Sequence, residues 1–195
     1  MASEAGRDRR AAMRLLLENR GALLLVTGLG ATSWDAAATG DDERNFYLWG
    51  AMGGAAMVGL GLALARPERP VLVATGDGEM LMGLSALATI GALAPKNLAI
   101  AVFDNARYGE TGMQASHTEE KTSLAAVACA CGIEKAFDIA DEKALRDFAR
   151  LLPRREGTLF ACVKILAQEA PRVLPPRDGG FLRFRFRRAL GVESR

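Results

Sequence analysis

Short apolar runs alternate with longer segments of helical character along the chain. The runs at residues 22–28, 71–75 and 98–103 are almost wholly apolar, which is typical of strands buried on both faces. The predicted strands cover residues 22–28, 71–75, 98–103, 136–139 and 158–165, and the predicted helices cover residues 8–19, 51–65, about 80–93, 121–131 and 141–152. Strands separated by helices of this length predict a mostly parallel sheet with helices on both faces, a doubly wound α/β fold.

Two stretches lack a clear period and are predicted as loops. Residues 33–50 mix polar and aromatic side chains, and a polar segment runs from residue 104 to about residue 120. The helix predicted at residues 51–65 contains four glycines, at positions 53, 54, 59 and 61. Because each glycine inside a helix costs about 1 kcal/mol relative to alanine, this helix needs close packing against a neighbour.

The composition is typical of one globular domain spanning residues 1–195. Half of the residues are apolar and a quarter are charged. No segment has 18 consecutive apolar residues, and no apolar signal region follows the charged start MASEAGRDRR, so we expect a cytoplasmic protein with no membrane partner. Three cysteines without a Cys-x-x-Cys spacing predict small buried hydrophobic residues rather than a disulfide framework, a zinc site or an iron–sulfur site.

Positive charge is concentrated at the C-terminal end. The chain has a net charge of +2, but residues 172–195 hold seven arginines against two acidic residues, a local balance of +5 that leaves −3 for the rest. Phe and Arg alternate over residues 183–187, a period of two that predicts one apolar face and one charged face. We predict that residues 172–195 dock on this domain or on another protein, in preference to nucleic acid. At the other end of the chain, residues 1–20 are predicted to form an N-terminal helix.

Two short polar motifs stand where long apolar runs end. Gly76-Asp77-Gly78 follows one run, and Asp104-Asn105 follows the next. Ligands of open parallel sheets bind outside the carboxyl ends of the strands, where glycines let backbone N–H groups approach an anion. Asp77 and Asn105 offer hard oxygen donors of the kind that Mg²⁺ combines with phosphate oxygens. Together the motifs predict a magnesium–diphosphate site, although either alone would more simply be a tight turn or a helix cap.

With 25 residues between Gly78 and Asp104, the two motifs resemble the diphosphate-binding signature of thiamine diphosphate enzymes. The segment FYLWGAMGGAAMVGLGLALARPERPVLVATGDGEMLM is similar to the diphosphate-binding module of 2-oxo-acid decarboxylases. The segments DNARYGETGMQASHT and PPRDGGFLRFRFRRAL resemble sulfopyruvate decarboxylase beta subunits and the matching half of phosphonopyruvate decarboxylases. The resemblance covers the chain from about residue 22. It implies a thiamine diphosphate- and Mg²⁺-dependent carbon–carbon lyase that decarboxylates a small anionic 2-oxo acid.

The resemblance also implies a set of binding residues. Asp77 and Asn105 would bind Mg²⁺ through their side chains and Arg107 through its backbone oxygen, while Met52 would hold thiamine in its bent conformation. Glu79 occupies a position where many relatives have a small residue, so we expect its side chain to point outward and only its backbone N–H to contact the diphosphate. The full cofactor-binding set is Gly50, Met52, Gly76, Asp77, Gly78, Glu79, Asn105, Arg107, Tyr108 and Gly109.

The catalytic residues and the substrate follow from the same resemblance. His117, the single histidine, and Glu110 are candidate catalytic residues, with Thr111 and Gln114 as weaker candidates; a solvated or structural histidine is the alternative. The substrates that the family implies are 3-sulfopyruvate and 3-phosphonopyruvate. We prefer 3-sulfopyruvate because separate small subunits are typical of that enzyme.

The resemblance also predicts that one part of the active site comes from outside this chain. The glutamate that activates the aminopyrimidine comes from a pyrimidine-binding module in this family, and 195 residues have room for one module only. The resemblance therefore implies a partner subunit that supplies this glutamate in a hetero-oligomer, α2β2 or larger.

Two other classes of protein are alternatives. Beta subunits of the pyruvate:ferredoxin oxidoreductase type also have Gly-Asp-Gly, but their Cys-x-x-Cys iron–sulfur ligands are absent here. A non-catalytic cofactor-binding or regulatory subunit is the second alternative, and the intact pair of Asp77 and Asn105 argues against it.

Overall fold

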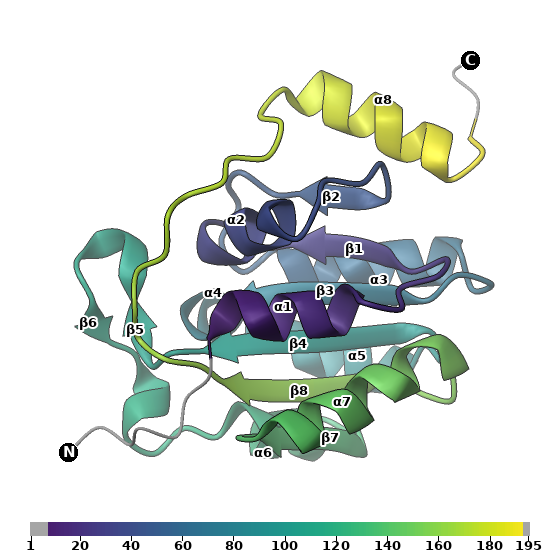
Figure 1. The fold of residues 1–195 in the computed structure, drawn as a ribbon. Helices are drawn as coiled ribbons and strands as arrows, with labels where there is room; N and C mark the ends of the chain where they lie inside the picture. Colours follow the sequence, from purple (N-terminus) through teal and green to yellow (C-terminus); the bar gives the residue numbers. More distant parts are fainter. Residues whose placement is uncertain (1–7, 193–195) are drawn as a thin grey trace.

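The computed structural model describes residues 8–192 and is built around a six-stranded sheet (Figure 1). The strand order is β2-β1-β3-β4-β8-β7, and every neighbouring pair is parallel. The strands of this sheet are β1 (Leu24–Thr27), β2 (Asn45–Tyr47), β3 (Val71–Gly76), β4 (Leu98–Asp104), β7 (Lys135–Ile139) and β8 (Leu159–Lys164). The predicted doubly wound α/β fold is confirmed.

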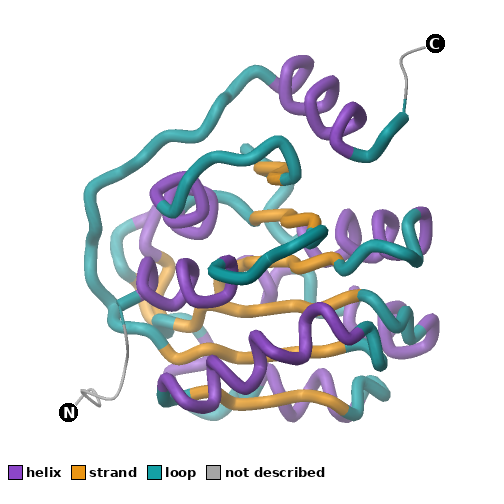
Figure 2. Tube along the Cα trace, turned by 45° about the vertical axis from the view of Figure 1, so that its right-hand side comes forward, coloured by secondary structure: helices purple, strands orange, loops and turns teal. Residues whose placement is uncertain are grey.

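Helices cover both faces of the sheet (Figures 1 and 2). The helices are α1 (Arg9–Leu17), α2 (Ala31–Ala38), α3 (Ala55–Ala65), α4 (Asp77–Met82), α5 (Ala86–Leu93), α6 (Leu124–Ala130), α7 (Glu142–Leu151) and α8 (Gly179–Ala189). Buried side chains of α1, α2 and α7 form one core cluster, and those of α3 to α6 form the other. Leu25 enters the first cluster and Leu24 and Val26 the second, as the alternation of side chains along a strand requires. Among residues 8–192 there is no helix with the length and apolar character that crossing a bilayer requires.

The chain topology brings three strand ends together. From β1 the chain runs to β2 on one side and then returns to β3 on the other side, so β1 and β3 form a topological switch point. β4 pairs with β3, and its carboxyl end lies at the same edge. Ligands of open α/β sheets bind at such points, outside the carboxyl ends of the strands.

Residues 33–50 contain most of helix α2 and the short strand β2, so the prediction that the whole stretch is a loop is wrong in part. α2 begins directly after Gly30, whose φ of 77° lies in the region that favours glycine. Its buried residues include Thr32, Ser33 and Asp35, so the face that packs inward is partly polar and gives no clear apolar period. β2 then contributes only three residues to the sheet edge.

The helix predicted at about residues 80–93 is two helices, α4 and α5, separated near Gly83. A side chain at Gly83 would place its Cβ 2.2 Å from the carbonyl oxygen of Gly53, so two loops touch through their backbones at this break. The preceding helix α3 begins only at Ala55, because Ala51 and Gly53 have φ values of 56° and 89°. The stretch after β4, predicted as a loop, contains a small antiparallel ribbon of β5 (Arg107–Tyr108) and β6 (Gln114–Ala115), with single 3₁₀ turns beside it.

The Phe/Arg segment is helical, so the prediction of a period of two over residues 183–187 is wrong. Asp178 caps α8 by accepting a hydrogen bond of 2.8 Å from the Phe181 N–H. Helical spacing buries Leu182, Arg185 and Phe186 together on one side, while Phe181 lies exposed. The helix packs beyond β2, at the edge of the sheet (Figure 1).

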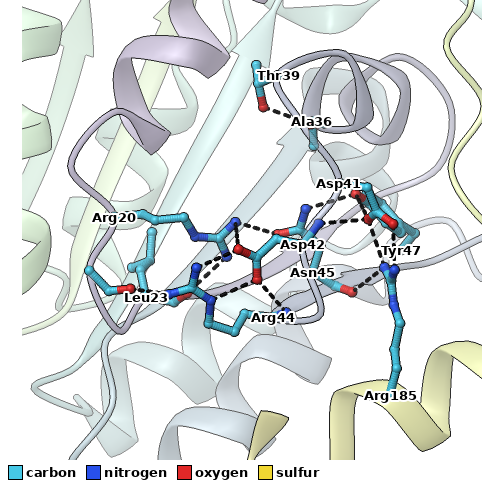
Figure 3. Close-up of polar contacts among 11 residues, drawn as sticks. Arg20, Leu23, Ala36, Thr39, Asp41, Asp42, Arg44, Asn45, Tyr47 and Arg185 are labelled. Carbon is cyan, nitrogen blue, oxygen red and sulfur yellow. Dashed lines mark hydrogen bonds and ion pairs between the residues drawn. The ribbon is translucent and has the colours of Figure 1, made fainter.

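Arg185 fixes α8 to this edge (Figure 3). Its guanidinium donates a hydrogen bond of 2.9 Å to the Asp41 carboxylate and one of 3.3 Å to the Asn45 carbonyl oxygen. The Tyr47 hydroxyl donates to Asp41 at 2.8 Å. We refer to Arg20, Asp41, Asp42, Arg44 and Arg185 as the arginine–aspartate cluster.

Candidate functional site

Asp77 and Asn105 lie at the ends of neighbouring strands. In the register of β3 and β4, Gly76 pairs with Phe103. α4 begins at Asp77, and Asn105 follows the last residue of β4. Both side chains line one cavity, so the structure brings together the two ends of the predicted magnesium–diphosphate site.

Asp77 is a buried carboxylate whose charge is not neutralised. The residue is 2% exposed, the Ser116 hydroxyl donates a hydrogen bond to it, and the Thr118 hydroxyl lies 3.3 Å from the same oxygen. No arginine or lysine in residues 8–192 forms an ion pair with it. Burial raises the pKa of Asp77; the Ser116 hydrogen bond opposes that shift and the nearby Asp104 charge adds to it. A cation at this carboxylate would offset the cost of burying its charge.

Asp104, by contrast, has an ion-pair partner and hydrogen-bond donors within the chain. The Lys164 ammonium group forms an ion pair with it, and the Thr118 hydroxyl and Cys162 thiol donate at 2.7 and 3.3 Å. Burial alone would raise the pKa of Asp104, but the hydrogen bonds from Lys164 and Thr118 lower it below its ordinary value. Asp104 therefore acts as a support that holds Thr118 beside Asp77.

The Asn105 side chain is oriented by a tight turn. Its amide oxygen accepts a hydrogen bond of 2.9 Å from the Arg107 N–H, and Ala106 between them has a φ of 57°. The Arg107 guanidinium forms an ion pair with Glu119. This turn keeps the Asn105 amide at the cavity wall, beside the end of β4.

Two glycines shape the wall next to Asp77. A side chain at Gly76 would meet no atom within 4 Å, so the backbone there faces open space. At Gly78, a Cβ would lie 2.5 Å from a ring carbon of Tyr108. Gly78 therefore lets the Tyr108 ring pack directly on α4, and Gly76 leaves room for a ligand.

The side chain of Glu79 is buried, so the expectation that it points outward is wrong. Glu79 is 4% exposed, and its Oε2 atom accepts a hydrogen bond of 3.2 Å from the Leu29 N–H. A Cβ at Gly28 would lie 1.6 Å from this oxygen, so Gly28 makes the space that the carboxylate fills. Burial raises the pKa of Glu79, opposed by the nearby Thr75 hydroxyl and backbone N–H groups. Glu79 thus ties α4 to the loop after β1.

A cavity of about 160 Å³ joins most of the predicted residues. The predicted residues that line it are Met52, Gly76, Asp77, Gly78, Glu79, Asn105, Arg107, Tyr108, Gly109, Glu110 and Thr111. Gly50, Gln114 and His117 are exposed and do not line this cavity. The structure therefore brings the residues of the predicted magnesium–diphosphate site together with Glu110, and places the single histidine outside this cavity.

Two parts of the cavity wall were missed by sequence reasoning. One is the loop after β1 with the start of α2, where Leu29, Thr32 and Trp34 line the cavity. Gly28 comes directly after β1 and Gly76 is the last residue of β3, so a glycine at a strand end is a signal that could have been used. The other is the segment of residues 166–178, here named the C-terminal connector, which passes the carboxyl ends of the strands between β8 and α8 (Figure 1). Its extended sequence carries no period that could have indicated this position.

Comparison with known proteins gives matches over most of the chain. The family model "Thiamine pyrophosphate enzyme, C-terminal TPP binding domain" matches residues 31–161. The chain is 37% identical over 160 residues to the sulfopyruvate decarboxylase subunit beta of Methanocaldococcus jannaschii, covering 82% of each chain. It is 46% identical over 131 residues to a phosphonopyruvate decarboxylase of Streptomyces hygroscopicus, covering 67% of this chain and 32% of that protein. The crystal structure of benzoylformate decarboxylase from Polynucleobacter necessarius has the same fold, with a TM-score of 0.70, 19% identity, and coverage of 84% of this chain and 34% of that one.

Proposed function

We propose a function from one established premise: this chain belongs to the thiamine pyrophosphate enzymes, whose C-terminal TPP-binding domain it contains. Its curated relatives are named decarboxylases, and we propose that this chain is the cofactor-binding subunit of an enzyme that converts 3-sulfopyruvate to sulfoacetaldehyde and carbon dioxide. The observation that carries this substrate is the 37% identity to a sulfopyruvate decarboxylase subunit beta over 82% of both chains.

The residues at the strand ends suit a magnesium–diphosphate group. Residues 8–192 contain no group of three or more His, Cys, Asp or Glu side chains that could hold a metal ion by themselves. Asp77 and Asn105 supply one carboxylate and one amide oxygen, so a Mg²⁺ ion there would need further oxygen ligands from phosphate or water. The uncompensated charge of Asp77 and the open space at Gly76 support this assignment.

Six of the ten predicted cofactor-binding residues have a defined role in this proposal. Asp77, Asn105 and the backbone oxygen of Arg107 would bind Mg²⁺, and Met52, 42% exposed at the cavity wall, would contact the thiamine rings. Gly76 and Gly78 leave the backbone accessible to the diphosphate. Bound thiamine diphosphate supplies the carbon nucleophile and the electron sink that allow carbon dioxide to leave a 2-oxo acid.

A partner subunit is part of the proposal, because it would supply the activating glutamate. The name "subunit beta" of three relatives supports a multi-subunit enzyme. A surface for such a partner is available on α3, α4 and α5. Five large apolar side chains there are 39 to 62% exposed, namely Met57, Val58, Leu64, Met82 and Leu93. We propose a hetero-oligomer, α2β2 or larger, with this apolar surface at the subunit interface.

Glu110 and His117 are the proposed substrate-contacting residues. Glu110 lines the cavity, and its carboxylate packs against Gly30. His117 lies on an exposed 3₁₀ turn, so it would reach substrate only in the assembled enzyme. His117→Ala in the complex tests this role, and unchanged decarboxylation would make it a surface residue.

Phosphonopyruvate is the second candidate substrate, favoured by the 46% identity to a phosphonopyruvate decarboxylase. That match covers only 32% of the other protein, whereas the beta subunits match over most of their length. Both substrates are 2-oxo acids with a second anionic group, so a direct comparison of rates distinguishes them.

The decisive experiment measures carbon dioxide release with and without the subunit that co-purifies with this chain. With thiamine diphosphate, Mg²⁺ and 3-sulfopyruvate, we expect almost no turnover by the chain alone and rapid turnover by the complex. Robust turnover by the chain alone would contradict the need for a partner. A complex that binds the cofactor but decarboxylates neither 2-oxo acid would instead support a regulatory subunit.

A further inference from the structure

We propose that Arg172, with the indole N–H of Trp34, forms a binding site for a tetrahedral oxyanion in the wall of the cavity. The oxyanion would be a phosphate or sulfonate type of group, presented by the diphosphate tail of the cofactor or by the anionic head group of the substrate. This inference rests on the proposed function, since that function brings such groups into the cavity. It assigns a binding role to the C-terminal connector, which no motif in the sequence indicated.

The C-terminal connector is held in place at several points. The Gln168 side chain donates a hydrogen bond of 3.2 Å to Asp8, the Arg10 guanidinium donates to the Pro171 carbonyl oxygen, and the Trp49 indole donates to the Pro176 carbonyl oxygen at 3.0 Å. Arg172 lies between these contacts and lines the cavity. Its backbone position is therefore fixed beside the strand ends.

Arg172 differs from the other two arginines at the cavity wall. Arg9 forms an ion pair with Asp35 at 2.9 Å, and Arg107 forms one with Glu119. Arg172 has no ion pair with any carboxylate of residues 8–192; its guanidinium carbon lies 4.6 Å from the centroid of the Trp34 ring. Contact with a ring face positions a guanidinium while its N–H groups stay free for an oxyanion.

Trp34 contributes a second donor without an acceptor. The residue is 9% exposed and lines the same cavity, and its Nε1 atom is buried with no hydrogen-bond partner in the part of the chain that the structure describes. A buried donor left unpaired is unfavourable, and an oxygen that reached it would remove that cost. The guanidinium of Arg172 lies over the ring of Trp34, and neither this guanidinium nor the indole N–H has a partner among the described residues. Both therefore favour an anionic ligand at this wall.

The carboxylates at the rest of the cavity wall make an unpaired cationic side chain necessary for anion binding. Asp77, Glu79, Glu110 and Glu169 all line the cavity, so an anion entering it meets negative charge. Mg²⁺ at Asp77 would offset this charge at one end, and Arg172 would offset it at the wall formed by α2 and the C-terminal connector. The planar fork of a guanidinium matches two oxygens of a phosphate or sulfonate, which a lysine ammonium group does not.

The test uses the full chain, two probes that are not turned over, and a matched control. Arg177 also lies on the C-terminal connector and over a tryptophan, 5.3 Å from the Trp49 ring centroid, but it does not line the cavity. Calorimetric titrations with magnesium pyrophosphate and with sulfoacetate compare Arg172→Ala, Arg172→Lys, Trp34→Phe and Arg177→Ala with the unmodified chain. We expect Arg172→Ala to weaken binding of at least one probe by about tenfold or more, Trp34→Phe by about threefold, and Arg177→Ala by less than about twofold.

The pattern of losses identifies the source of the oxyanion. Loss of pyrophosphate binding in Arg172→Ala assigns the site to the cofactor tail, and loss of sulfoacetate binding assigns it to the substrate head group. Arg172→Lys should recover only part of either affinity, because it restores charge without the planar fork. Equal binding by Arg172→Ala and Arg177→Ala, or binding of neither probe by the unmodified chain, overturns the proposal. Neither probe is decarboxylated, so an inactive complex with Arg172-dependent binding would remove the proposed function and leave this site intact.

Discussion

Aspartates in two regions of this molecule differ in whether basic side chains neutralise their charge. At the carboxyl ends of β3 and β4, Asp77 is buried and forms no ion pair with any residue that the structure describes, and burial raises its pKa. In the arginine–aspartate cluster at the edge of the sheet (Figure 3), the hydrogen bond from Arg44 lowers the pKa of Asp42 far below its ordinary value. The pKa of Asp41 is also lowered, because hydrogen bonds from Arg185 and Tyr47 outweigh its burial. A buried carboxylate whose charge no basic side chain neutralises indicates a site for a cationic ligand. A carboxylate whose charge arginines neutralise indicates a role in holding the fold together.

The strongest test of this comparison removes the negative charge of one aspartate in each region. Asp77→Asn should lower kcat/KM of the assembled enzyme by about 100-fold or more, because the cation loses its carboxylate ligand. The free energy of unfolding of the ligand-free chain should not fall, and should rise by up to about 1 kcal/mol, because an unneutralised buried charge is removed and no ion pair is lost. Steady-state kinetics and denaturant titration measure the two effects.

Asp42→Asn is the matched control for that variant. It should leave kcat/KM unchanged within about twofold and lower the free energy of unfolding by about 1 kcal/mol, because Arg44 and Arg20 lose their partner. If Asp77→Asn retained full activity, Asp77 would not be a metal ligand and the contrast would fail.

Ligand binding should stabilise the protein through the Asp77 region and not through the arginine–aspartate cluster. Thiamine diphosphate with Mg²⁺, at about 100 times Kd, should raise the thermal midpoint by roughly 5–10 °C, since this corresponds to about 2.7 kcal/mol. Differential scanning fluorimetry should record no such rise after chelation of Mg²⁺ or in Asp77→Asn, while Asp42→Asn keeps it. An equal rise without Mg²⁺ would contradict the cation's role.

The contribution of the arginine–aspartate cluster to stability can be measured by removing the Arg185 side chain that holds α8 against the sheet edge. Arg185→Ala should lower the free energy of unfolding by about 2 kcal/mol, because it removes a largely buried guanidinium from a partly exposed Asp41. Arg188→Ala is the control, since Arg188 is 68% exposed in its ion pair with Glu43 and should cost less than about 0.5 kcal/mol. Equal losses in the two denaturant titrations would show that Arg185 is not an anchor.

The smallest expected effect is the pH dependence of the same cluster. Because the pKa values of Asp41 and Asp42 are lowered by folding, their contribution is complete above the ordinary value of 3.8 and is lost as the pH falls below it. Between pH 6 and pH 3 the unmodified chain should lose about 1 kcal/mol more stability than Asp42→Asn. Parallel curves for the two proteins in acid denaturation would contradict this assignment.

The parts of the fold that could be predicted are those with a strong local pattern. The apolar runs of β3 and β4 and the polar residues that follow them locate Asp77 and Asn105 at one edge of a parallel sheet, because carboxyl ends of parallel strands lie together. α2 was not predicted, because Thr32 and Asp35 lie on its buried side and obscure the apolar period.

The remaining differences depend on contacts between residues distant in sequence. Glu79 turns inward because Gly28, about fifty positions earlier, leaves space for its carboxylate beside the Leu29 N–H. Arg172 reaches the cavity because Trp34 and Arg10, far earlier in the chain, hold the C-terminal connector there. Nothing in the local sequence around either residue indicates such a partner.

The backbone contact between Gly53 and Gly83 limits how this protein can diverge over evolutionary time. A side chain at either position would place its Cβ within 2.8 Å of the other loop's backbone, and Gly53 also has a φ of 89°. A substitution at one glycine would push apart the loop of Met52 and the helix of Asp77, and no single change at the other could restore the contact. The two glycines therefore constrain each other, and neither loop can gain a side chain at this contact without moving the other.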